Sequence, residues 1–185
     1  CWCALAGVAA EVGTWGGALT QGGSGRARGG GQRIADKVRR PGGGKWDWAK
    51  DGEGRTAGGE VARPVEWRGA KSIFVADDEA TAKRYAHGPE GPYHFYFKQL
   101  VRKLVGAGGR GNLFKTDQAM PDAAITPEYV TQRLVLAGTV DSVVAQLLAF
   151  REQVGDFGTL LYACHDWVDP ALATRSLHLM AEQGM

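Results

Sequence analysis

Three short apolar runs stand out in the second half of the chain, each bounded by polar or glycine-containing segments. The runs are AKSIFVA (Ala70–Ala76), LVLAG (Leu134–Gly138) and GTLLYAC (Gly158–Cys164). Each has the length of a strand, and its apolar residues are nearly continuous rather than alternating with polar ones. Continuous apolar runs are typical of parallel strands covered on both faces. We therefore predict three buried parallel strands.

Helical patterns separate these runs. The first helix is expected to begin at Asp77 or Asp78, with Glu79 in its first turn, and to end at Gly88. Further helices are predicted over PYHFYFKQLVRKLV, TPEYVTQR with Thr126 as N-cap, TVDSVVAQLLAFREQVG with Thr139 as N-cap, and PALATRSLHLMAEQ after Asp169. Strands and helices that alternate at this spacing predict βαβ units and a parallel α/β sheet.

Residues 1–66 have a different character, since they are rich in Gly, Arg and Trp and poor in aliphatic side chains. Such a segment buries too little apolar surface to offset its chain entropy. We predict an irregular or disordered segment over 1–66 and a packed domain over 67–185. The stretch GRARGGGQR can be interpreted as an RGG-like nucleic-acid tail or as a flexible segment. The second interpretation is favoured because the aromatic interleaving used in single-strand binding is nearly missing.

Charge and cysteine content narrow the class of protein. The formal net charge of the 185 residues is +2, which is too small to indicate a nucleic-acid or membrane partner. Three cysteines, two of them at positions 1 and 3, form no disulfide framework and fit a reducing, cytoplasmic location. No apolar run approaches the roughly 20 residues of a membrane span. The opening CWCALAGVAA has no basic region of the kind a signal peptide carries.

Candidate chemistry gathers directly after the third strand, in the sequence Cys164-His165-Asp166-Trp167. Ligand sites of parallel α/β folds lie at this end of the strands. A metal site is not expected, because adjacent strand residues point to opposite faces and no second ligand pair occurs at suitable spacing. His165 is either a proton-exchanging residue over a pocket or a structural histidine. Asp166 either orients it or satisfies loop amides, and Trp167 either walls a flat ligand or covers the fold.

Three segments carry a resemblance to a known family. They are WRGAKSIFVADDEATAKRYA, ITPEYVTQRLVLAGTVDSVVAQLLAFREQVGDFGTLL and FGTLLYACHDWVDPALATRSLHLMAEQ. Together they resemble the C-terminal part of the luciferase-like flavin-dependent monooxygenases, over about residues 45–185. The resemblance implies a partial (β/α)8 TIM barrel that holds the C-terminal strand–helix units only, since a whole barrel takes about 250 residues. Residues before Lys45 match no family segment, and their composition suggests another reading frame or unrelated sequence.

What the resemblance implies for function is an oxidation of a small organic substrate with molecular oxygen and reduced FMN from a separate flavin reductase. It implies a catalytic role for His165, cofactor contacts from Gly138, Thr139 and Trp167, and a place for Asp166 in the substrate pocket. The residues Tyr93, Phe95, Tyr96 and Phe97 are interpreted as a core-facing stripe or a pocket wall.

Two other functions stay open. One is hydride transfer with a flavin or deazaflavin on the same barrel, and the other is a non-catalytic, truncated remnant. Because half a barrel leaves open sheet edges and apolar faces, the chain alone is expected to aggregate or to be partly molten unless it forms a homodimer or its N-terminal part covers them.

Overall fold

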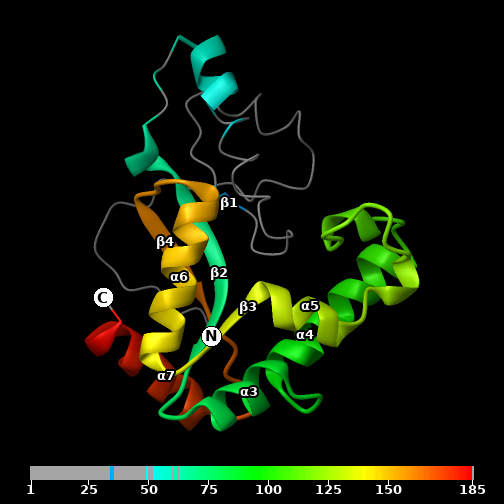
Figure 1. Cartoon of the computed structure of the whole chain (residues 1–185), viewed down its shortest axis with the longest axis vertical. Coiled ribbons are helices and arrows are strands. Elements are labelled where there is room, and N and C mark those ends of the chain that lie inside the picture. Colours follow the sequence, from blue (N-terminus) through cyan, green and yellow to red (C-terminus); the bar gives the residue numbers. More distant parts are fainter. Residues whose placement is uncertain (1–33, 36–48, 50–51, 60, 62, 185) are drawn as a thin grey trace.

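The computed structural model describes residues 34–35, 49, 52–59, 61 and 63–184. Four parallel strands form one sheet: β1 (Ile34–Ala35), β2 (Arg68–Val75), β3 (Val135–Gly138) and β4 (Thr159–Ala163). The last three are the predicted strands, which confirms both their positions and their parallel direction (Figure 1). β1 comes from the segment predicted to be irregular and pairs with the start of β2.

β2 lies at the centre of this sheet. Its residues 68–72 pair with β4, and its residues 72–75 pair with β3. Because Ser72 pairs with Val135 of β3 and with Ala163 of β4, those two strands lie on opposite sides of β2. β3 and β4 are therefore consecutive in the chain but separated in the sheet, which places β4 at an edge among the described strands.

The predicted helices are all present. They are α3 (Glu79–His87), α4 (Pro92–Val101), α5 (Pro127–Leu134), α6 (Val140–Val154) and α7 (Pro170–Gln183). Shorter helical turns are η1 (Pro64–Glu66), the π-helix η2 (Arg102–Gly106) that continues α4, η3 (Gly111–Leu113) and η4 (Asp122–Ala124), and residues 52–57 are also helical. No helix in the described part of the chain is long and apolar enough to cross a membrane.

Side-chain caps fix the starts of three helices as predicted. Asp78 accepts a hydrogen bond from Thr81 N at 2.8 Å, which settles the choice between Asp77 and Asp78. Thr126 accepts from Tyr129 N at 3.2 Å, and Asp169 accepts from Leu172 N at 3.0 Å. Such caps satisfy backbone amides that the first helical turn leaves without partners.

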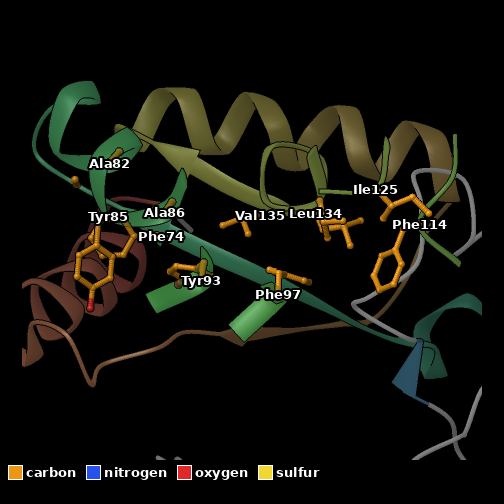
Figure 2. Packing of buried hydrophobic residues seen from close by; sticks show 12 residues of the cluster. Phe74, Ala82, Tyr85, Ala86, Tyr93, Phe97, Phe114, Ile125, Leu134 and Val135 are labelled. Atoms are coloured by element: carbon orange, nitrogen blue, oxygen red, sulfur yellow. The ribbon is translucent and has the colours of Figure 1, made fainter. Parts of the chain in front are cut away.

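Both faces of β2 are buried, as the continuous apolar pattern predicted. Phe74 lies in a core formed with α3, α4 and α5 (Figure 2). Ile73 and Val75 point to the opposite face, since successive strand residues alternate, and they pack against Val143 of α6 and Leu179 of α7. The helices therefore cover the central strand from two sides.

Most of residues 1–66 lies outside the described residues. Within the described part of it, Arg55 is buried and forms an ion pair with Glu66 at 2.9 Å. The division of the chain at residue 66 stays a prediction.

Candidate functional site

His165 occupies the loop that leaves the carboxyl end of β4. Its side chain is 8% exposed, and three aromatic rings surround it. The distances from the His165 ring centroid are 4.8 Å to Tyr93, 4.7 Å to Tyr96 and 4.5 Å to Trp167. Tyr93 and Tyr96 come from α4, and Trp167 from the loop itself. The structure thus brings two predicted site residues, His165 and Trp167, into contact.

The aromatic stripe of α4 divides between the two roles considered for it. Tyr93 and Phe97 are both fully buried in the core, one helical turn apart. Tyr96 is partly buried beside His165. Phe95 is 57% exposed, and its ring centroid lies 6.4 Å from that of Trp167. Helical periodicity therefore buries Tyr93 and Phe97 and leaves Phe95 exposed, while Tyr93 and Tyr96 both contact the His165 ring.

Two predicted site residues of the loop, Asp166 and Trp167, are exposed to solvent. Trp167 is 51% exposed, so one part of its ring contacts His165 and the rest is accessible. Asp166 is exposed. A half-exposed aromatic ring next to a buried imidazole can contact a flat ligand without a change in the core.

Tyr85 is a residue of this site that sequence reasoning missed. Its hydroxyl donates to the backbone carbonyl oxygen of His165 at 2.9 Å and lies 3.3 Å from that of Asp169. Burial raises the pKa of Tyr85, and the charges of Asp169 and Asp166 add to this rise. No local pattern identifies Tyr85, because 80 positions separate it from His165.

The turn at Gly138 and Thr139 contacts a different side chain, Glu79 of α3. Glu79 Oε1 accepts from Thr139 N at 2.9 Å and from Thr139 Oγ1 at 3.0 Å. These hydrogen bonds lower the pKa of Glu79. Thr139 is the N-cap residue of α6, as predicted, but its side chain binds Glu79 instead of a helix amide. The N-terminus of α6 therefore already holds a carboxylate, the kind of group that a helix N-terminus stabilises.

Gly138 permits this close approach. Its φ is 156°, and a Cβ atom there would lie 2.6 Å from Ser142 Oγ and 3.0 Å from Glu79 Oε1. Any larger residue would therefore displace Ser142 or Glu79.

The part of the chain that the structure describes contains no group of three or more His, Cys, Asp or Glu side chains arranged to hold a metal ion.

Comparison with known proteins identifies a monooxygenase of similar sequence. No family model matches the chain. The 3,6-diketocamphane 1,6-monooxygenase of Pseudomonas putida is 27% identical over 113 residues, which cover 60% of this chain and 29% of that enzyme.

Solved structures share the fold. The oxygenating constituent of 3,6-diketocamphane monooxygenase from the CAM plasmid of Pseudomonas putida, a type II Baeyer-Villiger monooxygenase in complex with FMN, superposes with a TM-score of 0.71 at 22% identity. The match covers 88% of this chain and 44% of that one. The coenzyme F420 dependent tetrahydromethanopterin reductase of Methanopyrus kandleri superposes with a TM-score of 0.55 at 12% identity, over 89% of this chain and 47% of that one.

The chain spans less than half the length of these relatives. In sequence and in structure, its neighbours are luciferase-like monooxygenases and a related F420-dependent enzyme, and the chain covers part of them. An α/β fold with a parallel sheet fits a part of their TIM barrel.

Proposed function

We propose that this chain is the C-terminal part of a flavin-dependent monooxygenase, which uses reduced FMN and molecular oxygen to oxidise a small organic substrate. The observation that carries the proposal is the aromatic surround of His165 at the carboxyl end of β4. Ligand sites of parallel barrels lie at this end of the strands. The similarity to a diketocamphane monooxygenase, and to its FMN-bound structure, supports the same reaction class.

The ring system of FMN fits the side chains present. Trp167 is half exposed and Tyr96 partly buried, and both rings lie close to the buried His165 ring. Flat aromatic ligands are bound by offset stacking and edge contacts with such rings. Bound FMN would supply the redox chemistry with oxygen. The chain's own residues would orient the ring and exclude water from it.

The phosphate of FMN fits less simply. Gly138 and Thr139 are proposed to bind the anionic group of the cofactor, but Thr139 N is already bonded to Glu79. A phosphate can reach that amide only if the Glu79 carboxylate leaves it, because two anions would otherwise share one donor. The proposal therefore includes an exchange between Glu79 and the cofactor phosphate.

Two loop residues receive roles in the reaction. His165 is proposed as the catalytic residue, which exchanges a proton with the flavin or substrate through its imidazole. Its burial among three rings supports this role, since the surround limits water around the imidazole. Asp166 is exposed beside it and is proposed to line the substrate pocket.

Two partners belong to the proposal. A separate flavin reductase would supply the reduced FMN. A second copy of the chain would cover apolar surface such as Leu161 of β4, which is 44% exposed. Sedimentation velocity tests the homodimer, and a concentration-independent monomer would refute it.

In the first experiment, the full chain is titrated with FMN and binding is measured from the fluorescence of the FMN. We expect saturable binding that Trp167→Ala weakens at least tenfold. The control is Leu148→Ala, which truncates an exposed apolar side chain on α6, away from the His165 loop. It should leave FMN binding unchanged. Equal effects of the two substitutions, or no binding by the unaltered chain, would contradict the proposed site.

Turnover then separates the reaction classes. The chain is supplied with FMN, a flavin reductase, NADH and a bicyclic ketone of the diketocamphane type, under labelled oxygen. Incorporation of one labelled oxygen atom into the product supports the monooxygenase. Oxidation of a reduced deazaflavin without oxygen uptake would favour hydride transfer instead. Binding without either reaction would favour a non-catalytic remnant.

A further inference from the structure

Tyr85 links α3 to the loop that carries His165. The loop begins after Ala163, the last residue of β4, and ends at Asp169, the N-cap of α7. The Tyr85 hydroxyl is 2.9 Å from the carbonyl oxygen of His165 and 3.3 Å from that of Asp169. A single hydroxyl therefore contacts the loop near its start and at its end.

The Tyr85 ring is itself held in place. It is 5% exposed and stacks on Phe74 of β2, with ring centroids 4.2 Å apart and planes inclined by 18°. Its edge contact with Tyr93 has a centroid distance of 6.4 Å. The hydroxyl is protonated at neutral pH and can donate, and burial raises its pKa further. The core contacts of the ring therefore fix the position of the donor.

The position of the His165 ring depends on the same loop. Its ring contacts two residues of α4, Tyr93 and Tyr96, while its backbone is bonded to α3 through Tyr85. A side chain can be directed into a surround of rings only if its own backbone is held at a suitable place. Tyr85 contributes to that hold from α3, a helix 80 positions away in the chain.

We propose that Tyr85 is a positioning residue, whose hydroxyl holds the loop from His165 to Asp169 closed so that the His165 ring stays among Tyr93, Tyr96 and Trp167. The structural part of this inference stands on the contacts above. Its consequence for cofactor binding rests on the proposed function.

Tyr162 provides a control. It is a partly buried tyrosine of β4, and its hydroxyl lies 2.6 Å from Ser176 Oγ. Ser176 belongs to α7 and not to the loop from His165 to Asp169. Tyr85→Phe and Tyr162→Phe therefore each remove one tyrosine hydroxyl, but only the first removes a hydroxyl that is bonded to that loop.

The experiment compares the ring signals of His165 by NMR in the full chain and in both variants. Loss of one peak in His165→Gln assigns the signal among the four histidines. We expect Tyr85→Phe to move the His165 ring signals toward their values in unstructured peptides, because the ring leaves its three aromatic neighbours. Tyr162→Phe should leave them where they are in the unaltered chain. Equal spectra in the two variants would overturn the inference.

A measurement on the unaltered chain covers the case in which Tyr85→Phe does not fold. The Tyr85 hydroxyl proton should exchange slowly with water and show a nuclear Overhauser effect to the amide of Asp166, which adjoins the accepting carbonyl. A rapidly exchanging hydroxyl without this effect would also overturn the inference.

FMN affinity tests the functional consequence. Tyr85→Phe should weaken FMN binding about tenfold, as expected when the ligand must order a loop that has lost one hydrogen bond, and Tyr162→Phe should not. A chain that binds no FMN before substitution would refute the proposed function, and the NMR comparison would still decide on the loop. If the His165 signals of Tyr85→Phe move toward their unstructured values while the FMN affinity is unchanged, the functional role of Tyr85 is refuted.

Discussion

Lys71 of β2 is a buried cation whose replacement should stabilise the protein. Its side chain is 7% exposed, and its Nζ lies 4.3 Å from the centroid of the Phe150 ring of α6. No carboxylate pairs with it in the described part of the chain. Burial lowers the pKa of Lys71 from 10.5 to about 8. The folded state therefore holds a charged group that would be more favourable in water.

The cost of this charge follows from the two pKa values. They differ by about 2.5 pH units, and each unit corresponds to 1.36 kcal/mol, so the cost is on the order of 3 kcal/mol. Below pH 8 both the folded and the unfolded chain are protonated at Lys71, and the whole cost is present. Between pH 8 and 10.5 the unfolded chain binds more protons, so the free energy of unfolding rises with pH.

We expect Lys71→Met to raise the free energy of unfolding by about 1–3 kcal/mol at pH 7. Methionine keeps an unbranched stem beside Phe150 and removes the charge, while about 0.5–2 kcal/mol of cation–π attraction is lost. Urea unfolding followed by circular dichroism at pH 7, 9 and 10 measures both the gain and its dependence on pH. The stability of the variant should lack the rise between pH 8 and 10.5 that Lys71 produces.

Lys98→Met is the control, since Lys98 is exposed on α4. It should leave the stability within about 0.5 kcal/mol and preserve the rise with pH. The reasoning would be refuted if Lys71→Met destabilised the chain at pH 7, or if the rise with pH persisted in that variant.

Three further predictions follow from other polar contacts. Glu79→Gln should weaken the hydrogen bond to Thr139 N and increase the preference of the chain for FMN over riboflavin, which calorimetric titration measures. An unchanged preference would show that the N-terminus of α6 does not bind the cofactor phosphate. Ser176→Ala should lower the free energy of unfolding by about 2–4 kcal/mol in urea, because Ser176 Oγ accepts from Val75 N at 2.6 Å and lies 2.6 Å from the Tyr162 hydroxyl; a loss under about 0.5 kcal/mol would show that water replaces it. The pKa of Glu128 is lowered to about 2, and the largest cause is its side-chain hydrogen bond with His94 at 2.7 Å. The ionised Glu128 carboxylate therefore stabilises the fold above pH 4.5, and this stabilisation is lost as the pH falls through about 2. An NMR titration of the Glu128 carboxylate should show this low midpoint and its return toward 4.5 in His94→Asn, and a midpoint that does not move would contradict the contact.

The helices and strands of residues 67–184 could be predicted because their signals are local. An apolar run such as Ile73–Val75 indicates a buried strand wherever it lies, and Asp78 or Thr126 caps a helix through an amide three residues away. The position of His165 after a strand also followed from chain order alone.

The order of the strands could not be predicted in this way. β3 and β4 both pair with β2, on opposite sides, although α6 alone connects them. Which strand pairs with which depends on how the helices pack on the two faces of β2, and no run of neighbouring residues encodes that packing. The helix α4 likewise showed an aromatic stripe in the sequence, but only the packing separates the buried Tyr93 from the exposed Phe95.

The same distinction holds for the candidate site. The sequence by itself determined the local elements and placed His165, Asp166 and Trp167 at the carboxyl end of a strand. Only the tertiary structure decided that Tyr85 bonds to the His165 carbonyl and that Glu79 occupies the amide of Thr139. The physical reason is range. Hydrogen bonds within a turn join residues three or four positions apart, whereas these contacts join residues 80 and 60 positions apart, and they form only after the core has brought α3 beside both loops.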